Sequence, residues 1–184
     1  MTEARVPAAA PGDDALLARW RGGDERAATL LVERHAGPLA RYVSSLGHAG
    51  EAEEIVQDTF VRAFASLDGF RAESSLRTWL FTIARNLVRD RVRSRRWEKR
   101  VVAIEEEHAV TEYDALDGTV ADETHDRLRA AVNELSPMQR EVFTLRVVEG
   151  LSYKEIAVVL ESSEGAARVH YHNAMKAIKE FLNE

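Results

Sequence analysis

Cysteine is absent from this sequence of 184 residues, which excludes disulfides, cysteine-ligated zinc and thiol catalysis within the chain. No apolar run reaches the roughly 18 residues that a transmembrane helix needs. The start, MTEARVPAAAPGDD, has no basic segment followed by an apolar stretch, so it does not look like a secretory signal. We therefore expect a disordered tail over residues 1–13 and a cytoplasmic protein.

Charge is unevenly distributed along the chain, and one segment has no basic residue, although the net charge is only −6. Residues 71–100 carry ten basic and three acidic side chains, whereas residues 101–126 carry nine acidic side chains and no basic one. A concentrated basic block is typical of a contact with a phosphate backbone. A solvated helix face is the simpler alternative. The acidic segment predicts an extended linker that avoids DNA.

Hydrophobic residues make up 45% of the chain, which is enough for a packed core, and their spacing is helical. Before the linker, apolar residues recur every three or four positions in three stripes, which predict a bundle of about four helices over residues 14–97. The helices should be interrupted at Gly22-Gly23, at Gly47 and at Leu67-Asp68-Gly69. Ser74 or Ser75 is the expected cap of the third long helix.

After the linker, residues 127–184 are again helical and their boundaries are marked. Ser136-Pro137-Met138-Gln139 and Ser152-Tyr153-Lys154-Glu155 are capping boxes, and Gly150 lies between them. Glu161-Ser162-Ser163 should form a tight turn, with Ser162 as the cap of the last helix. A short helix, a tight turn and a longer helix predict a helix-turn-helix motif. A plain packing pair of helices has the same pattern.

No catalytic or cofactor-binding constellation is present. Neither a P-loop nor a dinucleotide-binding glycine motif occurs, and the serines lie at helix caps. His170 and His172 are two positions apart, so on a helix they point in different directions and do not form a metal site. We expect an all-α protein of two small helical domains, residues 14–100 and 127–184, with no enzymatic activity, no cofactor and no metal.

Two segments, on either side of the acidic linker, resemble the sigma-70 superfamily of RNA polymerase sigma factors, in the extracytoplasmic-function (ECF) group. Residues 52–96, AEEIVQDTFVRAFASLDGFRAESSLRTWLFTIARNLVRDRVRSRR, are similar to the second conserved region of ECF sigma factors. Residues 135–178, LSPMQREVFTLRVVEGLSYKEIAVVLESSEGAARVHYHNAMKAI, are similar to the fourth region, which holds a helix-turn-helix for the −35 promoter element. The order of the two segments is also that of the family.

The resemblance implies a role for each group of residues. Contact with the core polymerase, at the coiled coil of the β′ clamp, is implied for Glu54, Gln57, Asp58 and Phe64. Recognition of the −10 element and its melted strand is implied for Asp68, Phe70, Arg71, Ser74, Arg85, Asn86, Arg89, Arg93 and Arg96. Recognition of the −35 element is implied for Arg168, Val169, His172 and Asn173. The last group departs from the arginine-rich family pattern, so the family's −35 consensus is not carried over.

The implied partners are RNA polymerase core (the β′ clamp and the β flap), promoter DNA and an anti-sigma factor, without membrane insertion. The residues themselves leave two alternatives to a sigma factor open. A stand-alone helix-turn-helix repressor would explain residues 127–184 but not residues 52–96. A sigma-like decoy for an anti-sigma factor would be expected to lack the basic block and the DNA-contacting residues, which are present here.

Overall fold

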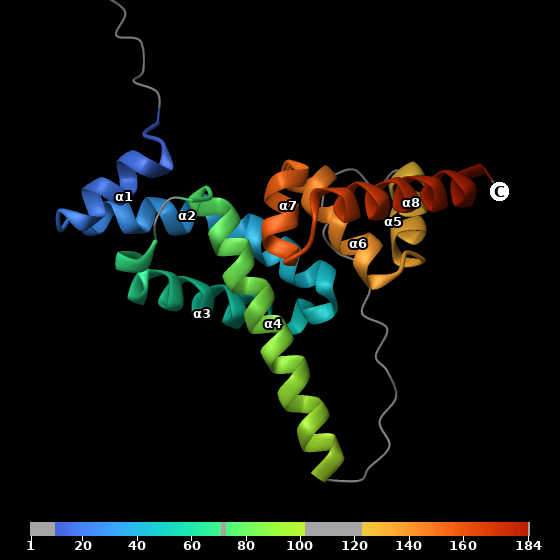
Figure 1. Cartoon of the computed structure of the whole chain (residues 1–184), viewed down its shortest axis with the longest axis horizontal. Coiled ribbons are helices and arrows are strands. Elements are labelled where there is room, and N and C mark those ends of the chain that lie inside the picture. The colour runs from blue at the N-terminus through green and yellow to red at the C-terminus, as the bar shows by residue number, and fades with distance from the viewer. Residues whose placement is uncertain (1–9, 71–72, 102–122, 184) are drawn as a thin grey trace, which may run out of the picture. The chain divides into compact units, whose positions relative to one another are not determined.

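The computed structural model describes residues 10–70, 73–101 and 123–183, and in these ranges it contains helices and no β-strand (Figure 1). The all-α prediction is therefore confirmed. The chain divides into two compact units, Met1–His35 and Ala36–Glu184. The predicted domain boundaries, which follow the acidic linker instead, stay a prediction.

The first unit contains α1 (Asp13–Arg21) and the first part of α2 (Glu25–Val43). As predicted, the glycine pair separates the two helices: Gly22 ends α1 and Gly23 adopts a φ of 91°, which a residue with a side chain rarely reaches. Asp13 joins the helices because its carboxylate accepts a hydrogen bond from Arg34 at 2.5 Å and lies 2.9 Å from Nε2 of His35.

The second unit begins with the remainder of α2, which is followed by short helical segments at Ser44–His48 and Ala49–Glu51. Helix α3 (Ala52–Ala65), a 3-10 turn (Leu67–Gly69) and α4 (Leu76–Val101) complete this part of the chain. Ser75 caps α4, since its hydroxyl accepts a hydrogen bond from the amide of Thr78 at 3.1 Å. Of the two serines predicted for this role, the structure selects Ser75.

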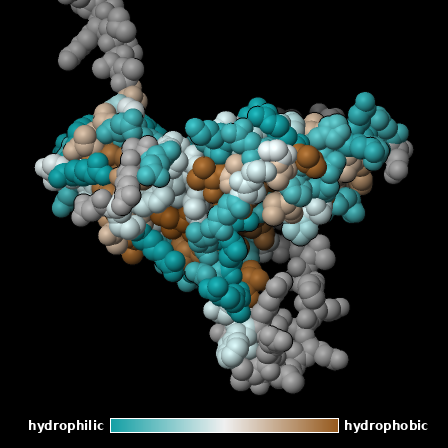
Figure 2. Space-filling view, in the orientation of Figure 1, coloured by the Kyte–Doolittle hydropathy of each residue, from teal (hydrophilic) through white to brown (hydrophobic). Residues whose placement is uncertain are grey.

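Helices α3 and α4 lie side by side and bury the apolar stripes that the sequence predicts (Figure 1). On α3 the stripe includes Ile55 and Phe60, and on α4 it includes Leu80, Ala84 and Leu87. Burial of a large apolar side chain stabilises a fold by roughly 1.5–3 kcal/mol. The opposite faces remain polar, and in Figure 2 the side of α4 that faces the viewer is mostly hydrophilic.

After the linker the chain forms α5 (Glu123–Asn133), α6 (Pro137–Phe143) with its continuation Thr144–Val148, α7 (Tyr153–Leu160) and α8 (Glu164–Asn183). Both predicted capping boxes are confirmed at the starts of α6 and α7. Helices α5, α6 and α8 share an apolar core, formed chiefly by Val132, Leu135, Phe143, Ala174 and Ile178.

The predicted linker, residues 101–126, is helical at both ends. Val101 is the last residue of α4, and α5 begins at Glu123. Charge alone does not end a helix, and acidic residues are favoured in a first helical turn because they interact well with the helix dipole. Residues 102–122 lie outside the described residues.

The turn between α7 and α8 differs from the prediction by one residue. The amide of Ser162 donates to the carbonyl of Ala157 at 2.9 Å, and Glu161 adopts a left-handed φ of 51°. This is the Schellman arrangement that closes a helix at its C-terminus, so Ser162 belongs to the end of α7. Ser163 caps α8 instead, because its hydroxyl accepts a hydrogen bond from the amide of Ala166 at 3.1 Å. The assignment of the cap to Ser162 was wrong.

The two neighbouring serines provide a matched test of this cap. Ser163→Ala should reduce the free energy of unfolding by about 1 kcal/mol, because an amide in the first turn of α8 loses its hydrogen-bond acceptor. Ser162→Ala should leave it nearly unchanged, because only its backbone amide is used. Urea denaturation followed by circular dichroism measures both, and equal losses would contradict the assignment.

Candidate nucleic-acid and protein interfaces

Helix α3 has one buried apolar face and one exposed acidic face. Ile55, Thr59 and Phe60 are buried, and the hydroxyl of Thr59 is satisfied by the carbonyl of Ile55 at 2.7 Å. On the other side Gln57 is exposed, and the side chains of Glu54 and Asp58 are 68% and 47% exposed. The three polar residues predicted to contact polymerase therefore lie where a protein partner can reach them. Phe64 is half-buried, with its ring centre 5.8 Å from that of Phe60.

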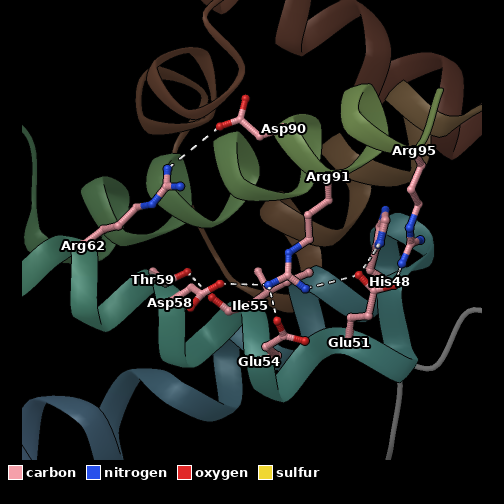
Figure 3. Close-up of polar contacts among 10 residues, drawn as sticks. All are labelled: His48, Glu51, Glu54, Ile55, Asp58, Thr59, Arg62, Asp90, Arg91 and Arg95. Carbon is pink, nitrogen blue, oxygen red and sulfur yellow. Dashed lines mark hydrogen bonds and ion pairs between the residues drawn. The ribbon is translucent and has the colours of Figure 1, made fainter. Parts of the chain in front are cut away.

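Two arginines of the basic block point toward carboxylates on and next to this acidic face (Figure 3). Arg91 of α4 donates to Glu54 at 2.9 Å and to Asp58 at 2.8 Å, and Arg95 donates to Glu51. This role was not predicted from the sequence, where the basic block was interpreted as a contact with a phosphate backbone or as a solvated helix face. The acidic residues at matching positions of the preceding helix were the signal that could have revealed it.

Glu51 and His48 lie at the end of the same group (Figure 3). Burial alone would raise the pKa of Glu51, but hydrogen bonds from Arg95 and Arg91 outweigh it and hold the pKa below its usual value. Burial lowers the pKa of His48, against the attraction of Glu51. The site thus favours a charged carboxylate and a neutral imidazole.

The loop predicted to capture a base of the −10 element is only partly described. Phe70 and Trp79 stack with ring centres 4.8 Å apart, and both are partly exposed, as is Ser74. Arg71 and the side chain of Asp68 lie outside the described residues. The stacked aromatic pair gives the loop a rigid support from α4, so Trp79 has a packing role there.

Asn86 lies in an open cleft of about 970 Å³ along α4. Its lining also includes Arg62, Arg89, Arg93 and the exposed Trp97. An amide, several guanidinium groups and an aromatic ring are the groups that bind single-stranded nucleic acid. The structure therefore brings together three of the predicted −10 residues, Asn86, Arg89 and Arg93. The side chain of Arg96 lies outside the described residues.

Arg85 differs from its neighbours because it is buried, with 8% of its surface exposed. Its Nε donates to Glu141 at 2.8 Å, and the same carboxylate oxygen accepts the hydroxyl of Tyr42 at 2.7 Å. Burial, together with the charge of Glu141, raises the pKa of Tyr42, so this tyrosine remains a donor. A DNA contact by Arg85 stays a prediction, and it requires this pair to open.

Arg89 also has a carboxylate partner, since it donates to Glu161 at 3.0 Å, but both side chains are 57% exposed. An exposed pair of this kind is worth about 1 kcal/mol or less, so a phosphate can replace the carboxylate at little cost. Arg93 is 82% exposed and donates to Asp90, three positions before it in α4.

The predicted −35 residues share the first half of α8. Arg168, Val169, His172 and Asn173 are all exposed. The guanidinium of Arg168 lies 4.6 Å from the ring centre of Tyr153 and donates to Glu164 at 3.1 Å. Tyr153, the first residue of α7, was not predicted for this site. Its ring restricts the motion of the arginine that is best suited to read a guanine.

Within the described ranges, no group of His, Asp and Glu side chains has the geometry to hold a metal ion, and no helix there is long and apolar enough to cross a membrane.

Comparison with known families gives two matches within the chain. Residues 31–98 match the model of sigma-70 region 2, and residues 125–178 match that of sigma-70 region 4. The first contains α3, α4 and the cleft at Asn86, and the second contains the helix-turn-helix.

Curated relatives and solved structures are similar over nearly the full chain. The ECF RNA polymerase sigma-E factor of Salmonella typhimurium is 31% identical over 90% of this chain and 92% of its own length. The RNA polymerase sigma-H factor of Pseudomonas aeruginosa is 31% identical over 92% of this chain and 93% of its own. The sigma factor RpoE from Bartonella quintana, solved in complex with the anti-sigma factor NepR, superposes with a TM-score of 0.68 at 29% identity, covering 87% of this chain and 97% of that one. CnrH, solved in complex with the cytosolic domain of CnrY, gives a TM-score of 0.66 at 28% identity over 93% of this chain and 97% of its own.

The chain therefore belongs to the sigma-70 family of RNA polymerase sigma factors. Within that family it is a factor of the ECF type, with region 2 and region 4 and a short connection between them.

The charged group at Glu51 makes a prediction about pH. A carboxyl whose pKa is lowered in the folded state stabilises the fold above its unfolded value, which is near 4.5, and this contribution is lost as the pH falls through the folded value. Glu51→Gln should therefore reduce the free energy of unfolding at neutral pH and flatten its decline between about pH 5 and pH 3. Urea denaturation at a series of pH values measures both effects, and parallel declines in the two proteins would refute the argument.

Proposed function

We propose that this chain binds RNA polymerase core through α3, directs it to promoters through α8, and helps to open the DNA through the cleft at Asn86. The observation that carries this proposal is that one chain presents both an exposed acidic face on region 2 and an exposed recognition helix in region 4. As an ECF sigma factor, it is a non-catalytic initiation subunit. A stand-alone repressor would have no use for the acidic face.

The polymerase-binding face consists of Glu54, Gln57 and Asp58, with Phe64 at its edge. Two carboxylates and an amide on successive turns of α3 are suited to a basic, hydrogen-bonding partner. The partner is the coiled coil of the β′ clamp, and region 4 contacts the β flap.

Recognition of the −10 element combines the loop residues Asp68, Phe70, Arg71 and Ser74 with the cleft. The amide of Asn86 offers one donor group and one acceptor to the edge of an unpaired base. Arg89, Arg93 and Arg96 supply charge for the backbone, and Arg85 joins them when its pair with Glu141 opens.

Recognition of the −35 element uses the first two turns of α8 in the major groove. Arg168 can bond to guanine through two N–H groups, and His172 and Asn173 lie one turn further along the same helix. Val169 is 58% exposed, which suits contact with a thymine methyl group.

An anti-sigma factor is the proposed regulator, because both similar structures described above were solved with an anti-sigma factor or the cytosolic domain of a second protein. The proposed compartment is the cytoplasm, where polymerase and promoters are found. Promoter-dependent transcription by purified core polymerase, with and without the chain, tests the whole proposal. A decoy or a repressor would give no transcript.

The role of the α3 face predicts a loss of core binding. The variant Glu54→Ala, Gln57→Ala, Asp58→Ala should bind core polymerase at least about tenfold more weakly, a change of about 1.4 kcal/mol. Its helical content should remain unchanged, because all three side chains point away from the buried stripe. Fluorescence anisotropy of labelled protein titrated with core measures the affinity, and Glu33→Ala, an exposed residue of α2, serves as the control. Wild-type affinity in the triple variant would remove the assignment.

The two DNA-binding regions should fail at different steps. Asn86→Ala should slow promoter opening more than it weakens the first duplex complex, since its target is melted strand. Arg168→Ala should weaken the closed complex by about 1–3 kcal/mol if it bonds to a base. If Arg168 contacts phosphate only, affinity should fall for every sequence, with a smaller salt dependence. Footprinting of closed complexes and permanganate reactivity of the opened strand separate the steps, and equal effects of both variants on the closed complex would argue against this division.

A further inference from the structure

The arginines in the second half of α4 divide between two directions. Arg91 and Arg95 reach carboxylates of the α3 side, as Figure 3 shows, whereas Arg89 and Arg93 line the cleft at Asn86. The two pairs alternate along the helix at intervals of two residues, and such positions lie on opposite sides of a helix. We therefore expect Arg91 and Arg95 to have a different function from Arg89 and Arg93.

Arg91 is the centre of the α3 group. Its side chain is 22% exposed, and its two terminal nitrogens contact Glu51 at 3.3 Å, Glu54 at 2.9 Å and Asp58 at 2.8 Å. Burial alone would lower the pKa of Arg91, and the hydrogen bonds to these three carboxylates more than reverse that effect. One guanidinium thus holds three negative charges in place.

Two of these carboxylates belong to the proposed polymerase-binding face. Glu54 and Asp58 are four positions apart on α3, so their like charges would repel each other without a cation between them. The bonds of Arg91 use Oε1 of Glu54 and Oδ2 of Asp58. A carboxylate has two oxygens and about four acceptor positions, so a side chain fixed through one oxygen retains capacity for a partner's donor.

We propose that Arg91 is a positioning residue for polymerase binding, which holds Glu54 and Asp58 in the orientation that the basic, hydrogen-bonding surface of the partner requires. This inference rests on the proposed role of the α3 face. Association normally has to immobilise exposed side chains at about 0.5–1.5 kcal/mol for each long one. Because Arg91 already orders Glu54 and Asp58 when the protein folds, less conformational entropy is lost when the partner binds.

As a positioning residue, Arg91 would have a different function from the one that its charge suggests. From its place in the basic block, Arg91 would be expected to contact DNA phosphates, and its replacement would then reduce DNA affinity. As a positioning residue it instead affects affinity for core polymerase, a protein, through two acidic side chains. A third possibility is a purely structural bridge between α3 and α4, which would affect stability alone.

The chain offers a matched control for the structural bridge. Arg95 of α4 donates to Glu51, the residue directly before α3, and Figure 3 shows this pair at the end of the same charged group. Arg95→Ala removes an ion pair between α4 and the start of α3, but the hydrogen bonds and ion pairs of Glu54 and Asp58 go to Arg91. A general loosening of the two helices would therefore affect both variants, whereas loss of positioning would affect only Arg91→Ala.

The experiment measures the affinity of the full chain for core polymerase. Arg91→Ala should bind about tenfold more weakly, equivalent to about 1.4 kcal/mol, and Arg95→Ala should bind as the wild type does. Arg91→Lys keeps the charge but not the fork of N–H donors, so its affinity should lie between those of the wild type and Arg91→Ala. Wild-type affinity in Arg91→Lys would overturn the positioning role, and this variant decides the matter if Arg91→Ala does not fold.

Double variants distinguish positioning from a separate contact. In the background Glu54→Ala, Asp58→Ala, the further change Arg91→Ala should have almost no effect on core affinity, because nothing remains to position. In the background Gln57→Ala, the two losses should multiply, since the side-chain hydrogen bonds of Arg91 go to Glu51, Glu54 and Asp58. Full additivity with Glu54→Ala, Asp58→Ala would overturn the inference.

Different results would contradict the positioning role of Arg91 and the proposed polymerase-binding face. If Glu54→Ala, Asp58→Ala itself leaves core affinity unchanged, the polymerase-binding face is misplaced, and the positioning role falls with it. If that variant binds weakly but Arg91→Ala binds as the wild type does, only the positioning role is overturned. A loss of affinity for promoter DNA by Arg91→Ala alone, in the absence of polymerase, would assign Arg91 to DNA instead.

Discussion

The structure of region 2 depends on how one helix, α4, accommodates many guanidinium groups. Helix α4 has to bury an apolar stripe against α3 and yet carry a dense series of arginines, which repel one another. This conflict is resolved because arginines that point in different directions from α4 have different surroundings. Arg91 and Arg95 have carboxylates of the α3 side, Arg85 has the buried Glu141, and Arg89 and Arg93 remain accessible in the cleft. Charge that looks uniform in the sequence is therefore divided between ion pairs within the protein and side chains that remain accessible in the cleft.

Local patterns were sufficient to predict most of the fold. The spacing of apolar residues gave the helices and their buried faces, and the capping boxes at Ser136 and Ser152 gave the starts of α6 and α7, because both depend on residues within one or two turns. The cap of α8 was misplaced because two adjacent serines are chemically equivalent. Only the left-handed conformation of Glu161, which makes Ser162 the closing residue of α7, distinguishes them.

The candidate site was harder to predict, because its details depend on residues far apart in the chain. Glu141 lies 56 positions from Arg85, and no local pattern indicates that they form a buried pair. The same holds for Arg91, whose partners on α3 are 33 to 40 positions away. Tyr153 looked like an ordinary residue of a capping box, yet its ring supports Arg168. The residues named for the −35 element came from the family resemblance, which did not indicate the contact between Arg168 and Tyr153.

With the proposed roles of the two arginine pairs, their alternation on α4 would also link two binding events. Because α4 is one continuous helix, it cannot rotate about its axis to improve the α3 side without also moving Arg89 and Arg93. If polymerase binding fixes that rotation, it changes promoter affinity by some factor, and thermodynamic reciprocity requires promoter binding to change polymerase affinity by the same factor. If that factor is greater than one, the subunit holds core more tightly while it occupies a promoter. It would then bind core more weakly once the DNA is left behind, and dissociation after initiation would follow from the geometry of a single helix.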